Sequence, residues 1–303
     1  MEETRKLTER AKSFLLDIAR GIGIGIAFII PGFSGGSVAA ILGIYERLVS
    51  AIADIFTDFK SSFKTLLPVG LGMIIGIIAL LFTLSWALSA YPLPTVSLFV
   101  GLALGGMPSI TDKIKGDRVN IKNLIAATIP ALVVLSISFM PIGAEKNLFD
   151  LSIGGYILLF LIGIIGSSAL VIPGISGSML LLILGYYNPI VNLATDHLLL
   201  GKDVGISILV LGVTAIGIAV GFIAISVVMK LLLKKYPRAT YFAIIGFILG
   251  SIPTIFVSTA KESGITFKTL PTSALHWIAC AILLIVGAVI SYGLVIYSRK
   301  HQK

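Results

Sequence analysis

Long apolar stretches set the strongest limit on what this chain can fold into. Leu66 to Ala90, Ile206 to Met229 and Ala274 to Tyr297 contain no Asp, Glu, Lys or Arg. Each reaches the roughly 20 residues that a helix needs to cross a bilayer. Hydrophobic residues make up 57% of the 303 residues and charged ones only 12%, which excludes a water-soluble fold. We therefore expect an all-α polytopic membrane protein.

One sequence motif occurs twice along the chain. Residues 30–37 (IPGFSGGS) match residues 172–179 (IPGISGSM) at an offset of 142, and Tyr91-Pro92 matches Tyr236-Pro237 at an offset of 145. The chain thus divides into a segment 1–13, a first repeat 14–148 and a second repeat 152–300, which we expect to form one integrated membrane domain. Each repeat contains one interrupted apolar segment and then three ordinary spans.

Basic residues between the spans predict the topology. They form four clusters: Arg5, Lys6, Arg10 and Lys12; Lys113, Lys115, Arg118 and Lys122; Lys230, Lys234, Lys235 and Arg238; and Arg299, Lys300 and Lys303. Cytoplasmic loops are rich in Lys and Arg. All four clusters, and with them both termini, are cytoplasmic only if each interrupted segment is a re-entrant helical hairpin. Because three spans follow each hairpin, the second repeat is predicted to be inverted, as in many secondary transporters.

The two hairpin tips are the predicted binding site. Proline ends a helix, glycine permits a reversal and serine caps the next helix. Non-helical backbone is excluded from contact with lipid, so both tips should lie inside the bundle. Helix N-termini and hydroxyls favour an anion such as phosphate. The candidate residues are Pro31, Gly32, Ser34, Gly35, Gly36, Ser37, Pro173, Gly174, Ser176, Gly177 and Ser178.

Glycine pairs elsewhere predict helix packing. Gly72/Gly76, Gly101/Gly105, Gly217/Gly221 and Gly246/Gly250 have the spacing that lets membrane helices approach closely. Gly32/Gly36 has the same spacing, but its proline and serine neighbours favour binding.

Four further polar residues are candidates for phosphate pairing or for coupling to a proton or another ion. Arg20 and Arg47 could bind phosphate, or could extend to the cytoplasmic interface. Glu46 could carry a proton or orient Arg47, yet the corresponding position of the second repeat is Asn188. An acidic role of Glu46 would therefore have no counterpart in the second repeat.

Other functional classes have little support in the sequence. Cys280 is the single cysteine, and the three histidines are scattered, so we expect no metal and no cofactor. The net charge of +9 arises from loop residues, which argues against nucleic acid as a partner.

The duplicated motif, together with Leu42-Gly43-Ile44-Tyr45-Glu46-Arg47 and Leu184-Gly185-Tyr186-Tyr187, resembles the polyprenyl-phosphate transporter family. The resemblance covers nearly the whole chain. It implies a non-enzymatic flippase of the plasma membrane that returns undecaprenyl phosphate, the lipid carrier of peptidoglycan and cell-envelope synthesis. The second motif of the family usually carries an acidic residue where this chain has Asn188.

Two alternatives remain open. Gly32-Phe33-Ser34-Gly35 and Gly174-Ile175-Ser176-Gly177 also fit the Gly-x-Ser-Gly pattern of intramembrane serine hydrolases, for which His276 would be the base. A small-anion channel or transporter could use the same half-helix ends without a lipid ligand.

Overall fold

Two short helices follow the predicted breaks in the chain. The computed structural model describes residues 2–29, 35–116, 120–175, 177–198, 201–265 and 273–301. Within them, α1 (Glu2–Ile29) precedes α2 (Gly35–Ile41), and α8 (Ile153–Val171) precedes α9 (Gly177–Ile183). Gly23 of α1 packs against Val38 and Leu42, and Gly166 of α8 packs against Leu181. Each long helix thus pairs with the short helix that follows it.

The remaining elements continue each half in the same order. They are α3 (Tyr45–Ala53), α4 (Phe59–Ala90), α5 (Pro92–Gly106), α6 (Pro108–Thr111), η1 (Asp112–Ile114) and α7 (Ile121–Phe139), then α10 (Tyr187–Asn192), the π-helical η2 (Leu193–Leu198), α11 (Val204–Lys235), α12 (Pro237–Glu262) and α13 (Ala274–His301). The described residues contain helices and no strands, as predicted.

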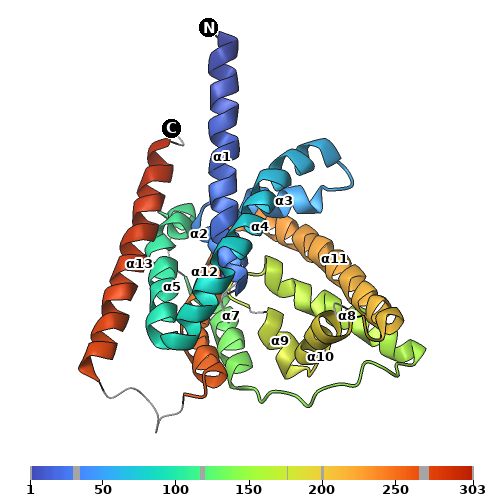
Figure 1. The fold of residues 1–303 in the computed structure, drawn as a ribbon. Helices are drawn as coiled ribbons and strands as arrows, with labels where there is room; N and C mark the ends of the chain where they lie inside the picture. Colours follow the sequence, from blue (N-terminus) through green and yellow to red (C-terminus); the bar gives the residue numbers. More distant parts are fainter. Residues whose placement is uncertain are drawn as a thin grey trace.

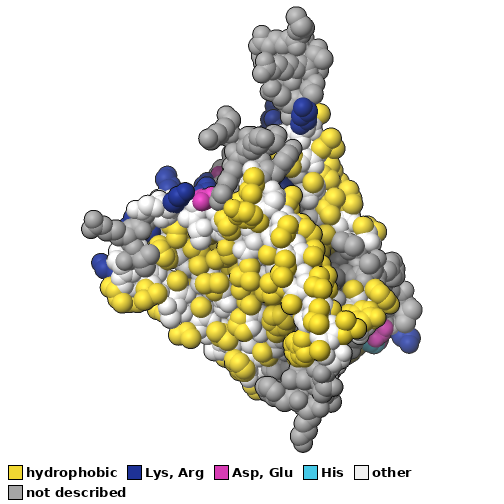
Figure 2. Space-filling view, turned by 90° about the vertical axis from the view of Figure 1, so that its left-hand side faces the viewer, with side chains coloured by type: hydrophobic (Ala, Val, Ile, Leu, Met, Phe, Trp, Pro, Cys, Tyr) yellow, Lys and Arg dark blue, Asp and Glu magenta, His cyan; other side chains and the backbone are white. Residues whose placement is uncertain are grey.

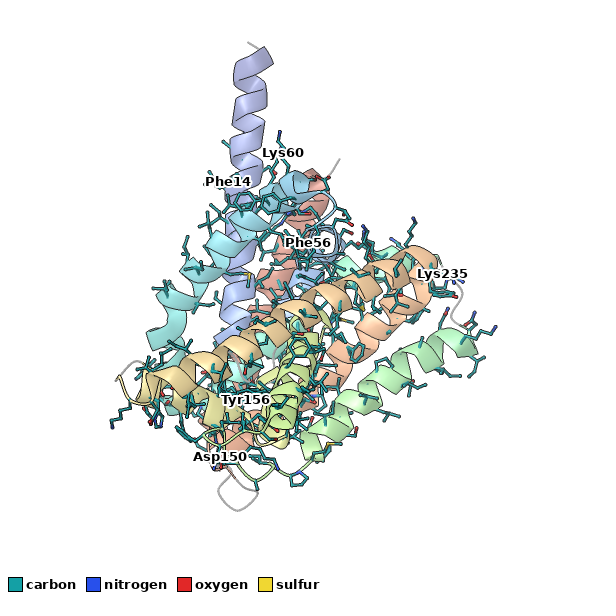
Figure 3. The ribbon with its side chains drawn as sticks, turned by 90° about the vertical axis from the view of Figure 1, so that its right-hand side faces the viewer. Phe14, Phe56, Lys60, Asp150, Tyr156 and Lys235 are labelled. Atoms are coloured by element: carbon teal, nitrogen blue, oxygen red, sulfur yellow. The ribbon has the colours of Figure 1, made fainter. Side chains whose placement is uncertain are left out.

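Within the described residues, six helices are long and apolar enough to cross a membrane: α4, the segment from α5 to η1, α7, α11, α12 and α13. This number matches the six predicted spans. The pair formed by α9 and residues 187–198 bends by 109°, which is typical of a broken span or a re-entrant loop. Both chain ends lie at the same end of the molecule (Figure 1). Lys60 lies toward that end and Asp150 at the opposite one (Figure 3).

Matched positions of the two halves have matching backbone geometry. Gly43 and Gly185, which end α2 and α9, have φ angles of +70° and +78°. Tyr91 and Tyr236 separate α4 from α5 and α11 from α12, with φ angles of −138° and −133°. A proline follows each of these tyrosines and begins the next helix. The sequence repeat is therefore also a repeat of local structure.

The predicted glycine pairs lie at helix contacts. Gly72 and Gly76 place α4 against α1, and the corresponding Gly217 and Gly221 place α11 against α8. The two remaining glycine pairs, one in α5 and one in α12, each contact a helix of the other half. Gly101 and Gly105 approach α13, whereas Gly246 and Gly250 approach α7. The four main helix pairs thus correspond between the halves, and the opposite orientation of the halves stays a prediction.

Apolar side chains form both the core and the outer surface. The main core cluster joins α1, α2, α3, α5 and α12, with Ile24, Ala40 and Val96 among its buried members. Large apolar side chains are also exposed, including Ile285 and Val289 of α13. Figure 2 shows one such face, where hydrophobic side chains predominate. Lipid is the solvent that suits this surface.

Candidate functional site

The tip of the second hairpin is a tight buried turn. Helix α8 ends at Val171, and Pro173, which follows, is fully buried. Gly174 has a φ angle of +82° and lies directly against the backbone carbonyl of Phe247 in α12. A side chain there would be strained in conformation and would overlap α12, so both the turn and the close approach require glycine.

The two duplicated motifs meet inside the protein. The hydroxyl oxygen of Ser37 accepts a hydrogen bond of 2.7 Å from the backbone N–H of Gly174. Gly36 is so close to Val171 that a β-carbon would lie 2.7 Å from its carbonyl oxygen. The hydroxyl of Tyr45 donates to that same oxygen at 2.9 Å. The start of α2 thus packs onto the turn of the second hairpin.

This contact changes the expected role of Ser37. The sequence suggested a hydroxyl directed at an anion, whereas the side chain is fully buried and satisfies a backbone donor of the other repeat. The hydroxyl hydrogen of Ser37 can still donate to an acceptor. Ser37 therefore joins the two motifs, and it satisfies a backbone N–H of the second tip that lipid could not solvate.

A charged cluster lies nearer to the end that carries the termini. Asp17 is buried, and one of its carboxylate oxygens accepts hydrogen bonds from Arg20 at 3.0 Å and from Arg47 at 2.6 Å. Two guanidinium groups share one carboxylate, which leaves a net positive charge. Arg20 precedes the end of α1 by nine residues, or about 14 Å of helix. Guanidinium groups bind anions such as phosphate favourably.

Asp17 is the polar residue that sequence reasoning missed. Its signal was present, because a carboxylate three residues before Arg20 faces the same side of a helix. The partner Arg47 lies on α3 and is brought there by the hairpin fold. Glu46, beside Arg47, forms an ion pair with Lys113 at 3.5 Å, with both side chains about half exposed.

The position equivalent to Glu46 has an acidic neighbour from another segment. Asn188 donates a hydrogen bond of 2.7 Å to Glu145, which lies in the connection between α7 and α8. The same connection pairs with the end of α9, because the backbone N–H of Lys146 donates to the carbonyl of Gly185. Glu145 therefore places a carboxylate beside Asn188, where the sequence of the second repeat has no acidic residue.

The candidate residues fall into three groups. Gly36, Ser37, Pro173 and Gly174 form the contact between the tips. Gly35 and Gly177 begin α2 and α9, and Ser178 lies in the first turn of α9. Pro31, Gly32, Ser34 and Ser176 lie outside the described residues.

The histidine that the hydrolase alternative requires as a base lies outside both hairpins. His276 is in the first turn of α13, beside Trp277, and lines a cavity together with residues of α1, α4 and α5. Among the described residues of that cavity, none belongs to either duplicated motif.

Comparison with known proteins identifies relatives over almost the full length. A family model described as undecaprenyl phosphate translocase-like matches residues 24–269. A polyprenyl-phosphate transporter of Vibrio cholerae is 26% identical, with 96% of this chain and 99% of the relative covered. Another polyprenyl-phosphate transporter, of Staphylococcus aureus, is 30% identical, with 92% and 95% covered. No solved structure matches significantly.

Proposed function

Because the chain belongs to the undecaprenyl phosphate translocase-like family, we propose that it moves undecaprenyl phosphate, or a closely related polyprenyl phosphate, between the leaflets of the plasma membrane. The two curated relatives are named polyprenyl-phosphate transporters, which supports this class of substrate. The carrier lipid would thereby return to the cytoplasmic side for cell-envelope synthesis.

The observation that carries the proposal is the meeting of the two tips. Ser37 and Gly174 come from opposite halves of the chain and form a hydrogen bond inside a bundle of apolar helices. An amphiphile with a phosphate head needs a polar path through such a bundle, while its tail stays in lipid. Non-helical backbone enclosed by protein supplies that path without exposing polar groups to hydrocarbon.

The arginine cluster offers a second phosphate site, at the end of the molecule that carries the termini. The net positive charge that Arg20 and Arg47 retain beside Asp17 favours a phosphate at that end of the first hairpin. The positive-inside rule assigns this end to the cytoplasm. We therefore propose that the phosphate passes the tips and then pairs with these arginines.

A reconstituted assay tests the proposal. Purified protein is placed in vesicles with a fluorescent polyprenyl phosphate, and a membrane-impermeant quencher reports the fraction in the outer leaflet over time. We expect faster exchange between leaflets than in protein-free vesicles. Equal rates would overturn the proposal. A matched fluorescent phospholipid controls for leakage and for general scrambling, which would make both lipids move equally.

A further inference from the structure

A large apolar cavity lies away from the tips, between two pairs of helices. It has a volume of about 860 Å³ and is lined by α1 and α4 on one side and by α5 and α13 on the other. Sites for small ligands have volumes of roughly 300–1,000 Å³ and are mostly apolar. Leu98, Leu102 and Leu283 are among its lining residues. The cavity is thus large enough for a hydrocarbon ligand.

The cavity extends along the bundle from one end toward the core. Tyr91 and His276 lie near the first turns of α5 and α13. Helix α13 begins at the end opposite the chain termini (Figure 1). Ile26 and Phe99 line the cavity; Phe99 belongs to the core cluster that contains Ala40 and Tyr45, and Ile26 packs against that cluster. The inner end of the cavity therefore adjoins the core cluster that also includes residues of α2 and α3.

His276 is the unusual polar residue of the lining. Its Nε2 atom is buried and has no hydrogen-bond partner among the described residues. A buried polar group without a partner destabilises the folded protein. The side chain of His276 lines the cavity. An imidazole N–H donates to phosphate oxygens, so a ligand with a phosphate head would remove this cost.

We propose that this cavity binds a polyprenyl phosphate in the outer leaflet before transport. The phosphate lies beside His276, and the first isoprenyl units extend along Leu98 and Leu102 toward Ile26. The order of residues fits such a lipid, because the polar side chain is near the membrane interface and the leucines are deeper. The proposal rests on the proposed function and adds to it a loading site distinct from the tips.

Photo-crosslinking tests the loading site in the full chain. A polyprenyl phosphate with a diazirine on an early isoprenyl unit is incorporated into vesicles that contain the protein, and labelled peptides are identified by mass spectrometry. We expect labels on α5 and α13. Unlabelled polyprenyl phosphate should compete, whereas polyprenol and phosphatidylglycerol should not. Ala279 also lines the cavity. Ala279→Trp should therefore fill the cavity and reduce labelling at least tenfold, which equals about 1.4 kcal/mol.

Ile282→Trp is the matched control, because Ile282 is also on α13 but is exposed on the lipid-facing surface. Its labelling should equal that of the unchanged protein. His276→Ala should lower labelling, and His276→Gln, which keeps a donor, should restore part of it. Equal competition by phosphatidylglycerol would overturn the proposal. If the labels fell on other helices while the protein still transported the lipid, the loading site alone would be refuted. If the unchanged protein did not transport the lipid at all, the proposed function would be refuted as well.

Discussion

At the scale of single residues, the hydrogen bond from Gly174 to Ser37 gives a direct test of the tip contact. Ser37→Ala removes the acceptor and leaves a buried N–H without a partner, which costs about 1–3 kcal/mol. We expect a lower midpoint of thermal unfolding in detergent and slower movement of polyprenyl phosphate in vesicles.

Ser97→Ala is the control for this substitution. Ser97 is equally buried, but its hydroxyl donates to the carbonyl of Leu93 within the same helix. That carbonyl keeps its helical hydrogen bond when the hydroxyl is lost, so the cost should be small. Equal effects of the two substitutions would show that the contact between the tips has no special importance.

Asp17 gives a second prediction at this scale. Asp17→Asn removes the charge that Arg20 and Arg47 share, so the two guanidinium groups repel each other and lose their orientation. We expect a destabilisation of about 1–3 kcal/mol, because Arg47 is still partly in solvent. Transport should slow in the vesicle assay. Glu46→Gln, which breaks the more exposed pair with Lys113, should change stability by less than about 1 kcal/mol. A larger destabilisation by Glu46→Gln than by Asp17→Asn would contradict the importance assigned to Asp17.

At the scale of helices, packing depends on glycines at the points of closest approach. Gly287 of α13 lies against the backbone carbonyl of Leu98 in α5, so a β-carbon there would overlap the neighbouring helix. Gly287→Ala should separate α5 from α13 and lower stability by about 1–3 kcal/mol. The midpoint of thermal unfolding of the purified protein measures this change.

Gly293→Ala provides the comparison on the same helix. No atom lies within 4 Å of a β-carbon built at Gly293. Alanine is a better helix former than glycine by about 1 kcal/mol, so this substitution should be neutral or slightly stabilising. If Gly287→Ala were tolerated as well as Gly293→Ala, close packing would not explain the glycine pairs.

The sequence predicted the elements better than their contacts. Six apolar spans, two breaks at Tyr-Pro and two short helices after Pro-Gly follow from local chemistry. The sequence did not show that α5 packs on α13 or that α12 packs on α7, because a glycine pair indicates a contact surface without naming its partner. The contact of Asp17 with Arg47 was hidden for the same reason, since Arg47 reaches Asp17 only through the fold. Helix α4 also begins earlier than predicted, at Phe59, where Asp58 caps it by accepting a hydrogen bond from the N–H of Ser61.

At the scale of the whole molecule, charge distribution and helix count give the same orientation. The chain ends lie together (Figure 1), and Lys60 and Asp150 lie at opposite ends (Figure 3). Three long apolar helices, α4, α5 with its extension and α7, separate these two residues. An odd number of crossings places them on opposite sides of a membrane. The positive-inside rule then predicts that Lys60 is cytoplasmic and Asp150 is external.

Single cysteines test this orientation, because the chain has only Cys280, which is buried. In a Cys280→Ala background, Lys60→Cys should react with an impermeant maleimide only after the cytoplasmic face is opened, and Asp150→Cys should react in intact cells. Lys235→Cys, beyond the fourth crossing, should behave like Lys60→Cys. Reaction of positions 60 and 150 from the same side would require an even number of crossings between them. The second half would then have the orientation of the first, and the two hairpins would enter from one face.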